Sequence, residues 1–154
     1  MADSKLYPIG TGALKSRTIS GLFVEFGVIK CQRTRVTLAQ LNAGFTLLPA
    51  RPGVKWQILD MRMIAVGGAA TTADSADIAG TRAGSAVLLF VPLVAALTRS
   101  TLVRTMAGNT SILADGASFT PLDVNTPVTV KTAGTAMTVL TNLDVFLHYM
   151  AVQG

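Results

Sequence analysis

Charged residues are scarce in this chain. Of its 154 residues only 14% are Asp, Glu, Lys or Arg, whereas a soluble domain usually contains about 25%. Half of the residues are hydrophobic, and the mean hydropathy is +0.51. Few charges are therefore left to cover a free monomer. Either the polar surface consists mainly of Thr, Ser, Asn and Gly, or other subunits cover apolar surface, and we favour an obligate assembly.

Long hydrophobic runs and cysteine are also lacking. The longest apolar run, residues 86–97, is too short for a helix that crosses a bilayer, and Pro92 interrupts it. The first residues, MADSKLYPIGTG, lack the apolar region of a signal peptide, so we expect synthesis in the cytoplasm and no membrane partner. Cys31 is the single cysteine. It excludes an intrachain disulfide and favours a buried or idle thiol.

The residue types that catalysis and metal binding require are nearly absent. His148 is the single histidine, and the sequence contains no nucleophile elbow, zinc-protease motif or P-loop. On a strand, Asp144 would be about 13 Å from His148. Zinc needs several Cys or His ligands, and the pair Asp74 and Asp77 lacks the frame of a calcium loop. We therefore expect no enzyme, no catalytic residue, no metal and no cofactor, and we interpret His148 as structural or interfacial.

Aromatic residues make up only 6% of the chain, and Trp56 is the single tryptophan. A glycan-binding β-sandwich usually presents exposed aromatic platforms. Here Trp56 alternates with Val54 and Ile58 on an apolar face, so we predict that it lies in the core. An exposed Trp56 would instead favour a binding module.

Helical periodicity is absent, apart from one expected helical turn at residues 38–42 that ends before Gly44. Thr, Val, Gly and Ala dominate, and turn residues recur about every 8–12 positions, which is typical of a sandwich or barrel. The expected strands are residues 21–30, 32–38, 44–48, 54–66, 85–91, 95–103, 110–113, 119–122, 128–131 and 142–152.

In two of these strands the residue pattern also predicts which side chains point outward and where a bulge lies. In residues 32–38, Arg33 and Arg35 share a face that we expect to point outward. In residues 54–66 the apolar positions change parity, which predicts an extra residue, or bulge, near residues 58–60. These apolar positions are Val54, Trp56 and Ile58, and then Leu59, Met61, Met63 and Ala65.

Residues 66–78 and 131–145 resemble each other, as two related hairpins in a two-sheet fold would. In the first, we expect a strand to leave the core, a tight passage at Gly67 and Gly68, and a strand that returns at residues 75–78. Small residues there allow close approach of a neighbouring strand or subunit. We assign Gly67, Gly68, Phe146 and Met150 as candidate subunit-packing residues.

The charge is unevenly placed. Residues 1–35 carry six basic and two acidic residues, a net charge of +4, whereas residues 36–154 carry seven basic and six acidic residues, a net charge of +1. The basic residues of the first segment are Lys5, Lys15, Arg17, Lys30, Arg33 and Arg35. An arm that docks on an acidic partner is the favoured interpretation, and a solvated terminal segment is the alternative. Because residues 36–154 show no matching basic stripe, we expect no direct nucleic-acid binding.

From about residue 41 onward the order of segments resembles a known family. The segments are LNAG, a Pro-Gly turn, KWQILDMRM, GGAATTADSADI, VAALT, TLVR, TAGTAMT and NLDVFLHY. This order resembles the small β-rich virion proteins of tailed bacteriophages, of the head decoration or cement type. The resemblance implies a jelly-roll-like sandwich, often a trimer, that sits on the capsid and clamps neighbouring major capsid subunits. Some related small proteins are minor tail components instead.

We therefore predict an all-β chain: an antiparallel, jelly-roll-like β-sandwich with an extended N-terminal arm. Residues 1–35 would form the basic arm, with one or two strands, and residues 36–154 the sandwich domain. By analogy the arm would dock on neighbouring capsid proteins. The predicted function is a capsid decoration protein on the outside of a phage head, made in the host cytoplasm, with the major capsid protein and further copies of itself, as a homotrimer, for partners. A minor tail or glycan-binding module is the alternative.

Overall fold

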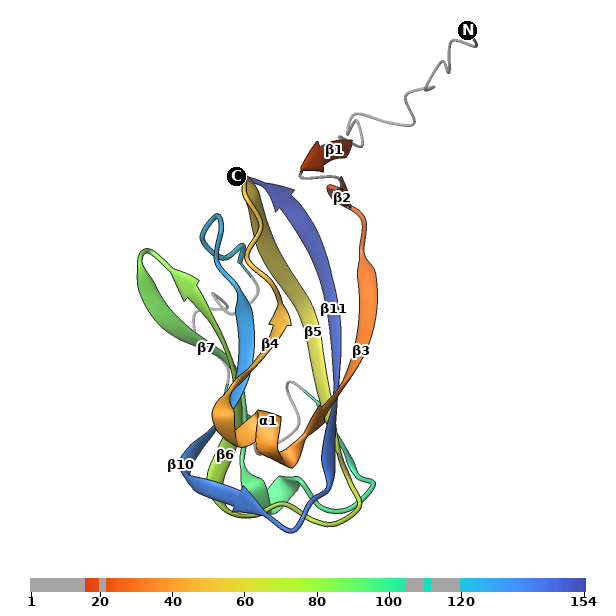
Figure 1. Ribbon diagram of the computed structural model, residues 1–154, viewed down its shortest axis with the longest axis vertical. Coiled ribbons are helices and arrows are strands. Elements are labelled where there is room, and N and C mark those ends of the chain that lie inside the picture. The colour runs from red at the N-terminus through yellow and green to blue at the C-terminus, as the bar shows by residue number, and fades with distance from the viewer. Residues whose placement is uncertain (1–15, 20–21, 105–109, 112–119) are drawn as a thin grey trace, which may run out of the picture.

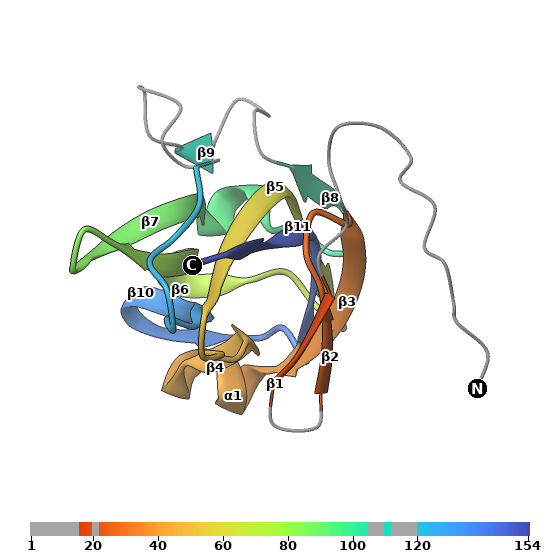
Figure 2. The same ribbon diagram turned by 90° about the horizontal axis from the view of Figure 1, so that it is seen from above.

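The computed structural model describes residues 16–19, 22–104, 110–111 and 120–154. Two antiparallel sheets face each other as a sandwich (Figure 1 and Figure 2), which confirms the predicted all-β fold class. The first sheet contains β4 (Phe45–Leu48), β10 (Val128–Thr138), β6 (Thr71–Arg82) and β7 (Ser85–Pro92), with the short β9 (Thr110–Ser111) at its edge. The second contains β3 (Lys30–Thr37), β11 (Asn142–Gln153), β5 (Val54–Val66) and β8 (Leu102–Arg104).

The strands pair as though one long two-stranded ribbon had been wrapped into the sandwich. β3 pairs with β11, β4 with β10, β5 with β8 and β6 with β7, all antiparallel. The ribbon reverses between β6 and β7, where Asp123 accepts hydrogen bonds from the backbone N–H groups of Ala83 and Gly84. It is wrapped so that β11 also pairs with β5, and β10 with β6. This wrapping produces the strand orders β3-β11-β5-β8 and β4-β10-β6-β7.

Strand β5 contains the predicted bulge. His148 of β11 lies opposite Asp60, and the next residue, Tyr149, lies opposite Ile58, so Leu59 is the extra residue. The bulge moves the apolar side chains before and after it onto the same, inner face of the sheet. Buried on that face are Val54, Trp56, Ile58, Met61, Met63 and Ala65.

Trp56 lies in the core, as predicted. It is only 4% exposed, its indole N–H donates a hydrogen bond to the Pro49 carbonyl at 3.0 Å, and its ring meets Tyr149 edge to face at 5.6 Å. The tryptophan therefore does not form the exposed platform that would have favoured a glycan-binding module.

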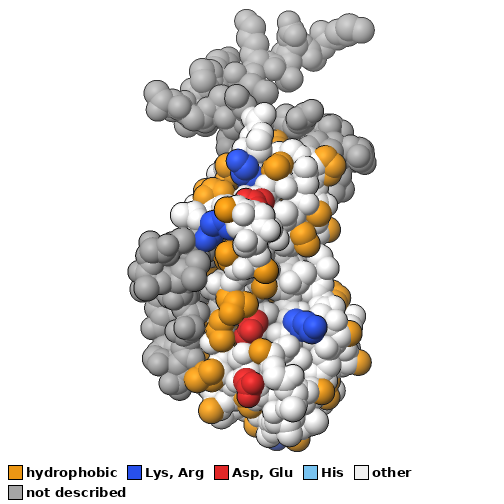
Figure 3. Space-filling model, turned by 90° about the vertical axis from the view of Figure 1, so that its left-hand side faces the viewer, with side chains coloured by type: hydrophobic (Ala, Val, Ile, Leu, Met, Phe, Trp, Pro, Cys, Tyr) orange, Lys and Arg blue, Asp and Glu red, His pale blue; other side chains and the backbone are white. Residues whose placement is uncertain are grey.

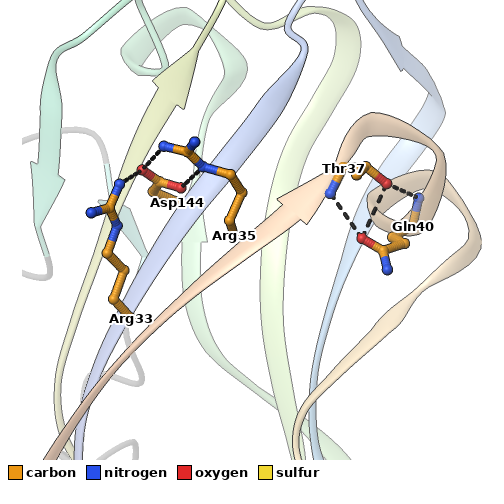
Figure 4. A network of polar contacts seen from close by, with 5 residues as sticks. All are labelled: Arg33, Arg35, Thr37, Gln40 and Asp144. Carbon is orange, nitrogen blue, oxygen red and sulfur yellow. Dashed lines mark hydrogen bonds and ion pairs between the residues drawn. The ribbon is translucent and has the colours of Figure 1, made fainter.

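The predicted helical turn is α1 (Leu38–Ala43). Thr37 accepts a hydrogen bond from the Gln40 backbone N–H, and the Gln40 side chain accepts one from the Thr37 N–H (Figure 4). This reciprocal capping box satisfies two donors at the helix start. The helix ends at Ala43, before Gly44 as predicted, and the φ of +92° at Gly44 suits glycine.

The two resembling segments of the sequence are arches rather than the predicted hairpins. β5 and β6 lie in different sheets, and so do β10 and β11, so each connection crosses from one sheet to the other. The crossings contact each other. The Thr141 N–H donates to the Val66 carbonyl at 3.0 Å, and a Cβ on Gly67, whose φ is +83°, would collide with the Thr141 side chain. The strand after the crossing, β6, also begins earlier and ends later than predicted.

The start of the chain differs from the prediction at residues 21–30. β1 (Ser16–Ile19) and β2 (Leu22–Glu25) form a separate two-stranded sheet, and a turn at Gly27, with φ of +74°, separates them from β3. β3 pairs with β11 from Lys30 to Thr37. The ladder with β11 thus holds the first half of β3 as well as the second, and the predicted boundary at residue 36 falls within this strand.

Two further segments were predicted as strands and are not. In residues 95–103, the short 3-10 helix η1 (Val94–Ala96) precedes a turn, and only the end belongs to β8. Residues 120–122 are irregular; Leu122 leaves the strand pattern because its side chain fills the space beside Gly80 and its N–H donates to Trp56 O at 2.8 Å. Of the predicted strand 110–113, residues 110 and 111 form β9, and residues 112 and 113 lie outside the described residues. Residue 119, the first of the predicted strand 119–122, also lies outside them.

Candidate interaction surface

The outer surface of the four-stranded sheet carries arginines from three strands, β3, β5 and β8. Register places Arg33 of β3, Phe146 of β11, Arg62 of β5 and Arg104 of β8 side by side in one row across the four strands. The next row contains Arg35, Asp144, Ile64 and Leu102. We call these two rows, together with Met150 farther along β11, the arginine face.

Asp144 holds two of these arginines in place (Figure 4). Its carboxylate accepts a hydrogen bond from Arg33 Nη2 at 2.5 Å, and two from Arg35, from Nε at 2.7 Å and Nη2 at 3.0 Å. Asp144 is 3% exposed, whereas the side chains of Arg33 and Arg35 are 55% and 52% exposed. The two guanidiniums thus cover the carboxylate and still face solvent.

The same contacts set the charge of the pair. The hydrogen bond from Arg35 is the main cause that lowers the pKa of the Asp144 carboxyl; the hydrogen bond and charge of Arg33 and the charge of Arg35 add to it, while burial opposes it. The pKa of Arg35 is raised, first by its hydrogen bond to Asp144 and then by the charge of that carboxylate. Asp144 therefore stays ionised well into the acid range and keeps both arginines oriented.

Two arginines of the row, Arg33 and Arg62, have further contacts. The Arg33 guanidinium lies 5.6 Å from the centre of the Phe146 ring, a cation–π distance. Arg62 Nε donates to Asp60 Oδ2 at 2.7 Å. Side chains held by such contacts lose less conformational entropy when a partner binds than free arginines would.

A third row beside the arginine face joins Cys31, His148 and Asp60. The Cys31 thiol is free and exposed rather than buried. His148 Nδ1 is buried and lies 3.5 Å from Asp60 Oδ2. Asp144, four residues before His148 in the sequence, binds Arg33 and Arg35. Within the described ranges, no three His, Cys, Asp or Glu side chains are grouped closely enough to hold a metal ion.

Of the six residues predicted to form a docking arm, the structure describes the side chains of Lys30, Arg33 and Arg35. Arg33 and Arg35 point outward from β3, as predicted, but they belong to the sandwich and are joined by Asp144. Lys30 pairs with Glu25 at 3.5 Å. Arg17 lies in β1, which is described by its backbone, and Lys5 and Lys15 lie outside the described residues.

The four predicted packing residues fall into two places. Gly67 and Gly68 contact their own chain: a Cβ on Gly68 would lie 2.9 Å from the Val139 carbonyl oxygen. Phe146 and Met150 are partly buried on the outer side of β11. Met150 also lines a groove of about 350 Å³ with Phe26, Gly27, Gln57 and residues 151–153, next to the end of the sandwich that carries β2.

Sequence reasoning missed Arg62, Arg104 and Asp144 as members of one site. Arg62 stands between Met61 and Met63, on the other parity from these apolar residues, but the sequence of residues 36–154 shows no basic stripe. The stripe exists only across strands, where the ladder joins Arg62 to Arg104 on one side and to Phe146 on the other.

The opposite side of the molecule is different (Figure 3). On the five-stranded sheet, charged side chains are sparse and scattered among hydrophobic and uncharged ones. Lys131 lies opposite Asp77 across β10 and β6, and Asp77 accepts a hydrogen bond from the Ser75 hydroxyl. Among the described residues of this side, charge of one sign does not gather in Figure 3.

Neither a known protein family, nor a curated protein, nor a solved structure matches this chain significantly. In the part of the chain that the structure describes, no helix is long and apolar enough to cross a membrane.

Proposed function

We propose that this chain is a non-enzymatic structural protein of a tailed-phage particle, a decoration protein that binds the outside of the head and stabilises the shell. The major capsid protein is its partner, and it acts as a homo-oligomer, a trimer by analogy with the proteins that the sequence resembles. It is made in the host cytoplasm and remains on the virion surface.

The strand order carries this proposal. A ribbon whose arms pair β3 with β11, β4 with β10, β5 with β8 and β6 with β7 has the connectivity expected of a jelly roll. Jelly rolls are frequent among viral capsid and lectin domains. Fold by itself does not determine function, so the proposal also depends on the resemblance in sequence and on the low charge of the chain.

Exposed hydrophobic side chains on the surface support a structural protein that acts through contacts with other subunits. Large hydrophobic side chains are exposed on several elements: Ile29 is 64% exposed, Leu88 and Leu93 are each 47% exposed, and Val139 is 63% exposed. In the proposed assembly further subunits would cover these side chains, as the low charge of the chain already favours. Multiple weak contacts on a repeating lattice add up through avidity.

Cosedimentation tests the proposal. The purified protein is mixed with mature heads that lack it, prepared from the phage that encodes it. Electron microscopy then locates the bound protein on the particle. We expect saturable binding and regular density on the outside of the shell. Binding to tails alone would support the tail module instead, and absence from particles would refute both.

The contribution of the arm is tested separately. Deleting residues 1–20 leaves the sandwich strands intact, so we expect the shortened chain to unfold at nearly the same temperature but to lose head binding. Unchanged affinity of a folded, shortened chain would show that the arm does not dock.

A further inference from the structure

We propose that the arginine face is a docking surface for an acidic patch on another protein. The identity of the partner rests on the proposed function: for a decoration protein, the acidic patch lies on the outside of the shell. The chemistry of the surface can be tested without that assumption.

The composition of the face is that of a protein interface. The cores of protein interfaces are enriched in Arg, Met and aromatic residues and depleted in Lys, Glu and Asp. The two rows and Met150 contain four arginines, one phenylalanine and one methionine, together with Ile64 and Leu102, and their single carboxylate, Asp144, is covered. Leu102 is 38% exposed.

The arginines keep donors for a partner. A guanidinium has five N–H donors. Asp144 receives one hydrogen bond from Arg33 and two from Arg35, and both side chains remain more than half exposed. Carboxylates are the groups that fit the remaining forked donors best in a protein partner.

An acidic protein fits better than a nucleic acid. Nucleic-acid binding depends on many simultaneous phosphate contacts, and its affinity rises with the number of cations on the path of the backbone. Here Asp144 pairs with Arg33 and Arg35, and Asp60, in the neighbouring row, pairs with Arg62, so four cations are offset by two carboxylates. The interleaved Ile64, Leu102 and Phe146 offer apolar contacts that a phosphate backbone does not use.

Two matched triple variants test the surface. Arg33→Gln, Arg62→Gln and Arg104→Gln together remove three charges from the face and leave Arg35 to cover Asp144. Arg82→Gln, Arg99→Gln and Lys131→Gln together remove three charges from outside its four strands. Thermal unfolding confirms that each variant is folded. If the face variant does not fold, Arg62→Gln with Arg104→Gln replaces it, with Arg82→Gln and Lys131→Gln as the control.

The first probe is a fluorescein-labelled polyglutamate peptide, measured by anisotropy at low ionic strength. We expect the native protein to bind it and the face variant to bind at least about tenfold more weakly, with the control within about twofold of native. Equal weakening of both variants would show that only net charge matters and would overturn the proposal. Tighter binding of a single-stranded or duplex DNA oligonucleotide than of polyglutamate would overturn it in favour of nucleic acid.

The second probe is the phage head. We expect the same ranking of the variants, and loss of native binding after the carboxyl groups of the shell are amidated. If native protein binds polyglutamate through the arginine face but does not bind heads, the proposed function is refuted and the docking surface is retained. Heads that bind the face variant as tightly as native protein would refute the docking surface and leave the function standing.

Discussion

Replacing Asp144 by asparagine removes the one charge that holds Arg33 and Arg35 together. The asparagine side chain would have nearly the same volume, but its NH₂ group is a donor and would face an arginine donor. Because the native carboxylate is 3% exposed, water cannot readily take its place beside the arginines. The substitution therefore tests an interaction rather than packing.

The size of the effect follows from the exposure of the partners. A hydrogen bond to a charged group contributes about 1.5–3 kcal/mol net, whereas exposed ion pairs contribute at most about 1 kcal/mol. The carboxylate is buried, but the arginine side chains are 55% and 52% exposed and can be hydrated once released. We expect Asp144→Asn to lower the free energy of unfolding by about 2 kcal/mol, and the Tm by about 4–8 °C.

The pH dependence supplies a second readout. The contacts with Arg35 and Arg33 lower the pKa of Asp144 in the folded state. Its contribution is therefore fully present above the unfolded pKa, about 3.9, and is lost as the pH falls through the folded pKa. The difference in stability between native protein and Asp144→Asn should be constant near neutrality and shrink below about pH 4.

Urea unfolding followed by Trp56 fluorescence measures the free energy of unfolding and its dependence on pH. Asp74→Asn, at an exposed aspartate of β6, is the control for loss of one negative charge. A double-mutant cycle with Arg33→Gln isolates the pair. A free energy of unfolding for Asp144→Asn that equals that of Asp74→Asn at neutral pH would refute the reasoning.

Three further predictions concern the scaffold. Gly67→Ala should lower the free energy of unfolding by more than about 1–2 kcal/mol, the usual cost of a left-handed Ala, because the new Cβ also meets Thr141; calorimetry should show partial recovery with Thr141→Ala, and no recovery would contradict the contact. Thr37→Ala should cost about 0.5–2 kcal/mol through loss of the helix cap to Gln40, and a change within error in urea unfolding would contradict the cap. Trp56 fluorescence should be blue-shifted and little quenched by acrylamide until the chain unfolds, since the indole is 4% exposed; strong quenching of the folded protein would show that the ring is outside the core.

Local patterns were sufficient for the elements that depend on neighbouring residues. The parity change in β5 predicted the bulge at Leu59, and alternation in β3 predicted that Arg33 and Arg35 point outward. Both follow from the two-residue period of a strand. The predictions failed where a turn interrupts a strand-like composition, as at Gly27, whose positive φ ends the ladder.

The candidate site lay beyond such patterns. Asp144 is separated from Arg33 and Arg35 by more than a hundred residues, yet it is their hydrogen-bond partner. Parity alone places Arg33 and Arg35 on an outer face, but it does not say which strands are neighbours or in what register. The arginine face required the pairing of β3, β11, β5 and β8.

The sequence by itself determined the class of fold, the placement of Trp56 in the core and the outward direction of Arg33 and Arg35, because periodicity and hydrophobicity act over a few residues. Only the tertiary structure decided that β11 lies between β3 and β5, that the β5–β6 crossing with its glycines packs on the β10–β11 crossing, and that scattered arginines form one row. Those outcomes depend on the wrapping of the whole ribbon, in which contacts between distant segments select one register from many that local patterns allow.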